Sequence, residues 1–254
     1  PAWSAPTGPG EGPTAVVSVA IAAAAGTATL VLVGFSVLSP ATRAWTLALS
    51  LAAWVLVIAL GWRRGGLPLA PVLAGIALTA VCAVATPSHQ SLDVFSYAMY
   101  GRMVAVHHEN PYDSVPADFP DDPMRPYVGR MWQRTPDIYG PAFTAVMVAA
   151  APVVGTSPLR VRLAYQVLAA GAFAALLAVL WRMTRSAVAL AFVGLNPLAT
   201  VSVVNGGHPD VFVALLLLVA LELARRRRPG ACALALATAA AVNATALVVA
   251  AAVA

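Results

Sequence analysis

Long apolar segments separated by short polar ones dominate this chain of 254 residues. Hydrophobic residues make up 60% of the sequence and charged residues only 10%, whereas soluble domains carry about 25% charged residues. An apolar stretch of about twenty residues can cross the hydrocarbon core of a bilayer as an α-helix. The sequence therefore predicts an all-α, polytopic membrane helix bundle, because helices satisfy their own backbone hydrogen bonds inside lipid.

Seven apolar segments are candidate spans, of which the sixth is short. They are residues 14–39, 44–62, 67–86, 163–181, 186–204, 211–224 and 231–254. An eighth segment, residues 141–155, begins at a proline and is broken by Pro152, so we expect a re-entrant or interfacial helix. The chain begins without Met and ends within an apolar segment, so we expect a single module, residues 1–254, from the N-terminal part of a longer protein.

The chain contains no Lys, so Arg provides all of its basic charge apart from His. The Arg residues cluster at the edges of the apolar segments. The groups that we place on the cytoplasmic side, where basic residues are enriched, are Arg225–Arg228, Arg63 with Arg64, and Arg182 with Arg185. This orientation puts residues 87–139, an extracytoplasmic loop, and residues 205–210 together on the outer side. The net charge of +5 therefore indicates membrane topology, and we expect no nucleic-acid partner.

Most other ionisable side chains lie in two polar windows, residues 87–139 and residues 205–210. Seven of the ten Asp and Glu residues lie in the first window, and Asp210 lies in the second. All four His residues lie in the same two windows. If both windows face one side of the membrane, they form a single water-exposed surface above the bundle. Ionisable residues between spans are functional-site candidates.

Residues 91–109 are predicted to form an amphipathic helix that lies on the outer leaflet. Its apolar stripe would consist of Leu92, Phe95, Met99, Met103 and Val106. The residues predicted on a different, polar face are Asp93, Tyr97, Tyr100 and His107. Asp93 has two interpretations, a first-turn acid that complements the helix dipole or a general base at the water–lipid boundary. The second acidic window favours the general base.

The second window interrupts the helical pattern with Gly206, Gly207 and Pro209. Two glycines allow the backbone to approach a ligand closely, and the proline can start the next helix. Asp210 would then either complement the dipole of that helix or take part in an active site, which we favour. Within the preceding apolar segment, Asn196 and Pro197 predict a kink, with the asparagine satisfying freed backbone groups.

No spacing of His, Cys and acidic residues matches a metal site. His107 and His108 are adjacent, so they point to different faces of a helix. The loop aspartates Asp118, Asp121 and Asp122 are spaced unlike a calcium-binding loop and indicate a solvated turn. We therefore expect no metal and no cofactor, with a divalent cation as the less favoured alternative.

Five short motifs follow one another in an order that is familiar from one enzyme class. They are Asp93, Asn-Pro-Tyr (110–112), Tyr-Gly-Pro (139–141), Asn-Pro (196–197) and Gly-Gly-His-Pro-Asp (206–210). This order resembles the GT-C membrane glycosyltransferases, especially the actinobacterial polyprenol-phosphate-mannose-dependent α-(1→6)-mannosyltransferases, over residues 67–224. Members of this family usually carry His-Asn-Asp where this chain has His-Pro-Asp, which leaves the role of Pro209 open.

The resemblance implies a multi-pass enzyme of the plasma membrane whose active site lies on the extracytoplasmic face. Its donor would be a sugar on a polyprenyl phosphate, with mannose expected, and its acceptor a glycan or lipoglycan of the cell envelope. The family's first-loop catalytic base corresponds to Asp93, and its second acidic motif corresponds to Asp210. Membrane lipids are the other expected partners, and no nucleotide-sugar site is expected.

The residue types also suit this chemistry independently of the resemblance. Inverting transfer needs a carboxylate that deprotonates the acceptor hydroxyl, which Asp93 can supply. It also needs cationic groups around the departing phosphate, for which Arg160 and Arg162 are candidates, with anchoring to lipid headgroups as their alternative role. Asp210 could orient the sugar, orient a helper lysine or a metal, or raise the pKa of the first carboxyl through like-charge repulsion.

Aromatic and imidazole side chains complete the predicted substrate-binding set. These candidates are Tyr97, Tyr100, Tyr139, His107 and His208. The tyrosines could stack on sugar faces or serve as structural residues at the membrane interface. Two rival functions remain at this point, a transporter and a non-catalytic membrane scaffold. A transporter would place ionisable residues near the bilayer midplane, where this chain has almost none.

Overall fold

The computed structural model describes residues 11–34, 38–88 and 91–248, and within these ranges it contains helices and loops but no strand. The long helices are α1 (Glu11–Gly34), α2 (Pro40–Arg63), α3 (Leu69–Ala85), α4 (Asp93–Ala105), α5 (Pro141–Val154), α6 (Pro158–Thr184), α7 (Ala187–Gly194), α8 (Asp210–Arg225) and α9 (Pro229–Val242). The short helical turns are η1 (Pro116–Asp118), η2 (Arg125–Tyr127), η3 (Trp132–Arg134) and η4 (Ala199–Val204). The predicted all-α class is confirmed.

Three helices of the described chain are long and apolar enough to cross a bilayer, by length and composition alone. They are Ala15–Gly34 within α1, α2 and α6. The helices α3, α5 and α9 are apolar but shorter. A membrane helix bundle is therefore supported, whereas the number of seven spans stays a prediction.

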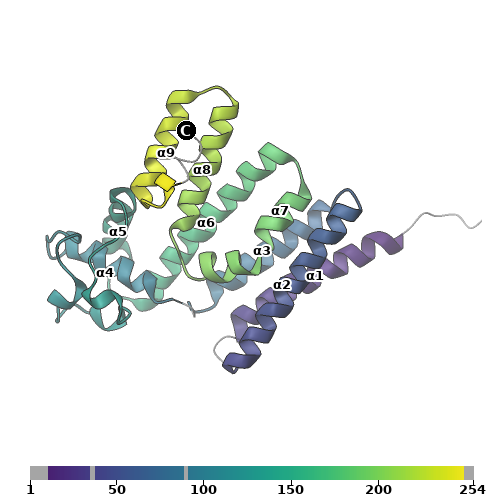
Figure 1. The fold of residues 1–254 in the computed structure, drawn as a ribbon. Coiled ribbons are helices and arrows are strands. Elements are labelled where there is room, and N and C mark those ends of the chain that lie inside the picture. The colour runs from purple at the N-terminus through teal and green to yellow at the C-terminus, as the bar shows by residue number, and fades with distance from the viewer. Residues whose placement is uncertain (1–10, 35–37, 89–90, 249–254) are drawn as a thin grey trace, which may run out of the picture.

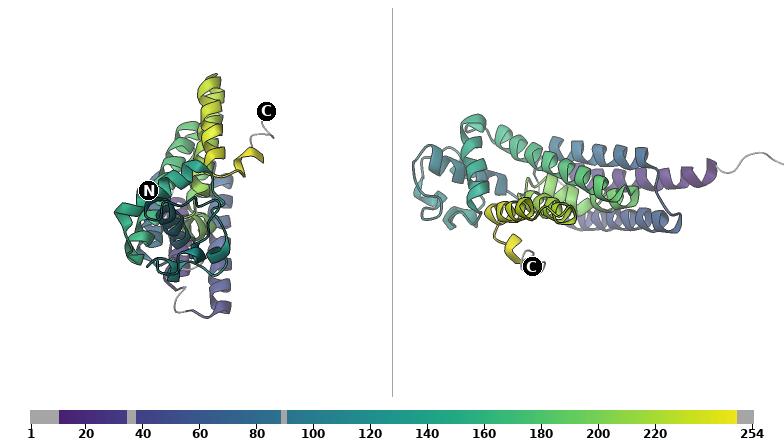
Figure 2. Two further views of the ribbon diagram at one scale, coloured as in Figure 1. Left: turned by 90° about the vertical axis from the view of Figure 1, so that its left-hand side faces the viewer. Right: turned by 90° about the horizontal axis from the view of Figure 1, so that it is seen from above.

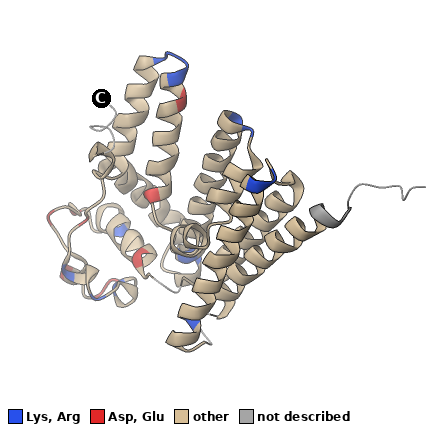
Figure 3. Ribbon diagram, turned by 45° about the vertical axis from the view of Figure 1, so that its right-hand side comes forward, with Lys and Arg blue, Asp and Glu red and all other residues tan. Residues whose placement is uncertain are grey.

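The helices form an elongated bundle with a lobe at one end (Figures 1 and 2). The helices α1, α2, α3, α6 and α7 share one apolar core, while α4, α5, α8, α9 and the start of α6 share a second. The lobe consists of α4, α5 and the loop between them, and α8 and α9 form an antiparallel hairpin beside it. The turns that follow α2, α6 and α8, which carry the predicted cytoplasmic arginines, lie toward the opposite end from the lobe (Figures 1 and 3).

The predicted span 186–204 is a broken helix rather than a continuous one. Helix α7 ends at Gly194, and a π-helical turn, η4, follows Pro197. The backbone N–H of Leu198 donates to Asn196 Oδ1 at 3.0 Å, which confirms the predicted kink and the role of the asparagine. In the π turn, the backbone N–H of Asn205 reaches the Thr200 carbonyl at 3.0 Å. Such turns are often found beside functional sites.

The predicted span 231–254 is wrong in its C-terminal part. Helix α9 ends at Val242, and Asn243 adopts an extended backbone with φ −153° and ψ 129°. Asn243 Oδ1 accepts a hydrogen bond from the Thr245 N–H at 3.0 Å, so its side chain competes with the helix for the backbone. Residues 249–254 lie outside the described residues. The described part of the first predicted span is helical as far as Gly34, and residues 35–37 of that span also lie outside the described residues.

Helix α5 corresponds to the predicted re-entrant or interfacial segment. It begins with Pro141 at its first turn and buries one stripe of residues, namely Phe143, Thr144, Met147, Ala151 and Val154. This stripe faces protein, as predicted, because α5 packs against α4. The two helices touch where Met147 of α5 meets Gly101 of α4: a Cβ atom at Gly101 would overlap the Met147 carbonyl. The position of α5 relative to a membrane stays a prediction.

Helix α4 confirms the predicted helix in residues 91–109, but the assignment of its faces is wrong. Tyr97 and Tyr100, which were predicted on the polar face, are at most 1% exposed. Leu92 and Val106 from the predicted apolar stripe are each 49% exposed. The reason is that protein surrounds α4 on several sides, so the large phenol rings become part of the core.

Candidate active site

Asp93, the first residue of α4, lies at the point where the two polar windows meet. Its Oδ2 atom is 3.2 Å from His208 Nε2, and its Oδ1 atom accepts a hydrogen bond from Trp132 Nε1 at 2.7 Å. Its backbone N–H donates to Ser91 Oγ at 3.0 Å. The side chain remains 20% exposed. The contact with His208 shows that the two windows meet at Asp93, whereas their position relative to a membrane stays a prediction.

The surroundings of Asp93 keep its carboxyl ionised. Burial alone would raise the pKa of Asp93, but hydrogen bonds from His208, Ser91 and Trp132 together lower it below its ordinary value. The hydrogen bond to Asp93 in turn raises the pKa of His208, against the opposing effect of burial, and the charge of Asp210 raises it further. The sequence-based suggestion that Asp210 raises the pKa of Asp93 is therefore wrong, because the imidazole lies against the carboxylate.

Asp210 is the first residue of α8 and is exposed. Its charge raises the pKa values of His208, Tyr97 and Tyr139, so it lies near all three. Among the described residues it has no ion-pair partner within 4.0 Å. Asp210 thus occupies the first turn of α8, where it complements the helix dipole, and also the rim of the site around Asp93.

The glycines of the second window serve packing rather than ligand access. A Cβ atom at Gly207, whose φ is +66°, would meet Val94 Cγ1 and Tyr165 Cβ. A Cβ atom at Gly206 would meet the Ser202 carbonyl and the His208 ring. The backbone at these glycines therefore does make a close approach, as predicted, but it approaches other protein residues rather than a ligand. It lets the window lie directly against α4 and α6 and so brings His208 to Asp93.

A cluster of aromatic rings lies beneath the site. The Tyr97 ring meets the rings of Tyr139, Phe143 and Tyr165 edge to face, with centroids 5.3 to 5.4 Å apart. The hydroxyls of Tyr97 and Tyr139 are 3.2 Å apart. The hydroxyl of the fully buried Tyr100 donates to the Thr135 carbonyl at 2.8 Å. Tyr97 and Tyr100 therefore cannot stack on a sugar as predicted, because protein covers both rings, and the structural interpretation applies to them.

Tyr139 is the one tyrosine of the predicted set that stays partly exposed in the described structure. Burial raises the pKa of Tyr139 to about 12, so the hydroxyl is neutral at physiological pH and can donate a hydrogen bond. The ring lies beside Tyr97 at the edge of the site. Among the predicted tyrosines, Tyr139 is therefore the accessible one, and its contact with a substrate stays a prediction.

Asp137, which sequence reasoning missed, holds Tyr139 in place. Its Oδ1 atom accepts the Tyr139 N–H at 2.9 Å, its Oδ2 atom accepts the Thr144 hydroxyl at 2.8 Å, and its own N–H donates to the Pro111 carbonyl at 2.8 Å. The residue is only 6% exposed, and burial raises the pKa of Asp137 despite these hydrogen bonds. An Asp two residues before the residue whose N–H it accepts is a local turn signal that the sequence does contain.

We expect Asp137→Asn to stabilise the protein at neutral pH. Because the pKa of Asp137 is raised in the folded state, its contribution to stability is full at acid pH and is lost as the pH rises through that pKa. Asn has the same shape and can accept from Tyr139 and donate to Thr144. The melting temperature of the variant should therefore exceed that of the wild type at pH 7.5, and the difference should shrink at pH 4. A lower melting temperature at both pH values would contradict this assignment.

A buried polar junction joins the end of α3 to the second window. Asn205, which is 1% exposed, donates through Nδ2 to the carbonyls of Ala83 at 2.9 Å and Pro87 at 3.0 Å. The fully buried Gln166 donates through Nε2 to the Asn205 carbonyl at 2.8 Å. These bonds satisfy carbonyls that a helix end leaves unpaired. They also fix the start of the first window against the second, directly ahead of Asp93.

The two predicted phosphate-binding arginines have different surroundings. Arg162 donates through one terminal nitrogen to the carbonyls of Val84, at 3.1 Å, and Thr86, and to Gln166 Oε1, at 2.9 Å. It therefore belongs to the junction at the end of α3. Arg160, in the first turn of α6, is exposed. Arg160 is thus the more accessible of the two for an anionic ligand.

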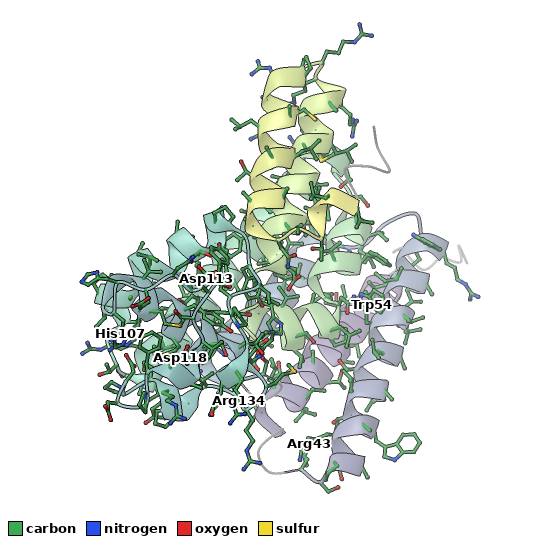
Figure 4. The ribbon with its side chains drawn as sticks, turned by 60° about the vertical axis from the view of Figure 1, so that its left-hand side comes forward. Arg43, Trp54, His107, Asp113, Asp118 and Arg134 are labelled. Atoms are coloured by element: carbon green, nitrogen blue, oxygen red, sulfur yellow. The ribbon has the colours of Figure 1, made fainter. Side chains whose placement is uncertain are left out.

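His107 lies apart from the rest of the predicted site. Its Nε2 atom is 2.7 Å from Asp122 Oδ2, and Arg102 forms an ion pair with the same carboxylate at 2.9 Å. Helical geometry separates residues 93 and 107 by about 20 Å. Figure 4 shows His107 at the outer edge of the lobe. The structure thus brings His208, but not His107, to Asp93. Trp132 joins them from a loop position that carried no local signal.

The described residues contain no group of three or more His, Cys, Asp or Glu side chains arranged to hold a metal ion. The absence of a metal or cofactor from the reaction therefore stays a prediction. What the site does offer is an ionised, partly exposed carboxylate with an imidazole beside it, a second carboxylate at the rim and a neutral phenol. These groups can accept a proton from a hydroxyl and bind a polyol.

Comparison with known proteins identifies the enzyme class. Residues 11–254 match the family model described as alpha-(1->6)-mannopyranosyltransferase, N-terminal domain. No curated protein and no solved structure matches the chain. The match agrees with the resemblance drawn from the five motifs and favours an enzyme over a transporter or a scaffold. The chain therefore belongs to the alpha-(1→6)-mannopyranosyltransferase family, whose N-terminal domain it represents.

Proposed function

We propose that this mannosyltransferase takes mannose from a polyprenyl-phosphate donor and transfers it to a cell-envelope glycan on the outer face of the plasma membrane. The observation that carries the proposal is the contact between Asp93 and His208, which joins the two polar windows at a partly exposed carboxylate. A lipid-linked donor suits the location of this site at the margin of an apolar bundle, where the sugar would be in water and the polyprenyl chain in lipid.

In the proposed reaction, Asp93 accepts the proton of the acceptor hydroxyl as its oxygen attacks the anomeric carbon of mannose. The bond from that carbon to the phosphate oxygen breaks, and polyprenyl phosphate leaves with the bonding electron pair. The configuration of the anomeric carbon inverts. A low pKa makes Asp93 a weak base, but the hydrogen bonds that lower it keep the carboxylate free of a proton before the reaction.

The neighbouring side chains have roles that follow from their positions. His208, whose pKa is raised, stabilises the Asp93 carboxylate and fixes its orientation. Asp210 and Tyr139 are placed to bind sugar hydroxyls, since both are accessible and near the carboxylate. Arg160 is the accessible cation of the predicted pair and would contact the departing phosphate. No step of this scheme requires a metal ion.

Transfer from a labelled lipid donor tests the proposal directly. Membranes that contain the full-length enzyme would receive radiolabelled polyprenyl-phosphate mannose with several glycan acceptors. Parallel reactions would receive a mannose nucleotide diphosphate as the control donor, with endogenous polyprenyl phosphate removed. We expect labelled glycan only from the lipid donor. Transfer from the nucleotide donor alone, or from neither donor with any acceptor, would contradict the proposal.

Trp132→Phe is expected to shift the pH dependence of transfer. Phe keeps most of the ring packing but removes the N–H that donates to Asp93 Oδ1. The ionised carboxylate loses a stabilising partner, so the pKa of Asp93 rises and the acid limb of the kcat/KM profile moves to higher pH. A hydrogen bond to a charged group contributes about 1.5 to 3 kcal/mol, so the rate at the acid end should fall about tenfold, with less change at alkaline pH.

Trp54→Phe is the matched control for that experiment. Trp54 Nε1 donates to the Ala191 carbonyl at 3.2 Å, within the bundle and away from the carboxylate. The same chemical change at this position should leave the acid limb where it is. Equal shifts in both variants, or no shift in Trp132→Phe, would show that the indole does not act on Asp93.

A further inference from the structure

The C-terminal ends of α6 and α8 line an open pocket at the opposite end of the bundle from Asp93. Its volume is about 190 Å³. It is lined by Val179, Arg182, Val219, Glu222, Leu223 and Arg226. Two of these residues are arginines, Arg182 in the last turn of α6 and Arg226 directly after α8, and three are aliphatic. Figure 3 shows arginine in the turns that follow both helices. The pocket therefore combines a cationic rim with an apolar wall.

Arg182 and Arg226 are both available to an anion. Arg226 donates through Nε to Glu222 Oε1 at 2.7 Å, and its side chain is still 53% exposed. That bond fixes the guanidinium while its terminal nitrogens can bind a further acceptor. Arg182 is exposed and forms no ion pair with any described side chain. The nearby Arg185 lies instead over the ring of Trp181, with its guanidinium carbon 5.8 Å from the centroid.

The surroundings of the pocket carry a large excess of positive charge. Arg225, Arg227 and Arg228 flank Arg226 in the sequence and are exposed, while Glu222 is the single acid among the lining residues. Helix C-termini carry partial negative charge, which disfavours an anion. Two arginines that line the same pocket offset this, because each guanidinium can bind phosphate through two parallel hydrogen bonds. Arginines that only set topology need no shared pocket.

We propose that this pocket binds the headgroup phosphate of an anionic phospholipid. The phosphate would lie between Arg182 and Arg226, and the upper part of an acyl chain would follow the aliphatic wall of Val179, Val219 and Leu223. A zwitterionic lipid would bind less well because its own ammonium group competes for the phosphate charge and meets the surrounding arginines. Basic pockets between membrane helices recognise anionic headgroups in this way. The site does not involve Asp93 and is independent of the proposed transfer reaction.

The binding of radiolabelled dioleoyl-phosphatidylglycerol to the full-length protein in neutral detergent tests the proposal. The variant Arg182→Gln/Arg226→Gln removes both lining cations. The matched control Arg225→Gln/Arg228→Gln removes the same charge from the same region, but neither position lines the pocket. We expect the first variant to bind about tenfold more weakly, whereas the control should change binding by about twofold or less. Each variant should remain monodisperse, which establishes that it is folded.

The competing explanations predict different results. Equal losses in both variants would indicate a general attraction between the arginines and anionic lipid and would overturn the pocket. Unchanged binding in Arg182→Gln/Arg226→Gln would place any lipid site elsewhere. If unlabelled dioleoyl-phosphatidylcholine displaced the labelled lipid at the same concentration as unlabelled phosphatidylglycerol, the pocket would not select an anionic headgroup, and the proposal would be wrong. Displacement by glycerol 3-phosphate at that concentration would identify a site for soluble phosphates rather than for a lipid.

Discussion

Asp93→Asn is expected to lower the rate of mannose transfer by about 10² to 10⁴-fold, the usual contribution of a positioned general base. Asn has nearly the same shape, and its amide oxygen can still accept from Trp132 Nε1, so the local geometry should survive. It cannot accept the proton of the acceptor hydroxyl. The measurement is the initial rate of transfer from polyprenyl-phosphate mannose by the full-length enzyme in membranes, divided by the amount of folded protein.

Asp121→Asn is the matched control, because Asp121 is an exposed aspartate in the same loop and does not contact Asp93. It should transfer at the wild-type rate. Asp210→Asn should lie between the two, since Asp210 is accessible at the rim and would bind sugar without taking the proton. If Asp93→Asn kept more than about a tenth of the wild-type rate, general-base catalysis at this position would be excluded.

Hydrophobic pattern and helix-breaking residues were sufficient to predict most of the helices. Apolar periodicity and length depend on neighbouring residues only, and so does the kink at Asn196 and Pro197. The same reasoning overestimated the last span because it gave Asn243 too little weight among alanines and valines. A single Asn whose side chain bonds to the backbone is enough to end a helix there.

The faces of α4 could not be predicted, because they depend on what packs around the helix. Tyrosine was counted as polar, yet its ring is large and apolar, and its hydroxyl needs only one partner to be buried. Tyr97 found that partner in Tyr139, and Tyr100 found it in the carbonyl of Thr135. Both partners come from the loop that follows α4. A periodicity argument within one helix does not include them.

Only part of the candidate site could be predicted, again because some of its contacts come from residues that are distant in the sequence. Asp93, Asp210 and His208 stand out because they are ionisable residues at the ends of apolar segments. Trp132 and Gln166 act over long separations, on Asp93 and Asn205 respectively, each 39 residues away. No local pattern distinguishes a tryptophan that supports a carboxylate from one that packs in a loop. Such roles become visible only when the fold brings the partners together.

Gly101→Ala is expected to destabilise the protein strongly, because α4 and α5 cross at this residue with their backbones in contact. A Cβ atom at Gly101 would overlap the carbonyl group of Met147, which is backbone and cannot turn aside as a side chain would. Overpacking of this kind costs about 1 to 3 kcal/mol or more. At roughly 2 to 4 °C per kcal/mol, the melting temperature of the purified full-length enzyme should fall by about 2 to 12 °C.

Gly171→Ala, within α6, separates this steric effect from the general effect of replacing a helical glycine. Apart from the adjoining backbone of α6 itself, nothing lies within 4 Å of a Cβ placed at Gly171, so the substitution should stabilise the helix by about 0.5 to 1 kcal/mol. The two variants should therefore shift the melting temperature in opposite directions. The crossing at Gly101 also holds the helix that begins with Asp93, so Gly101→Ala should lose transfer activity at temperatures where Gly171→Ala keeps it. Equal melting temperatures for the two variants would mean that α4 and α5 do not cross in this way.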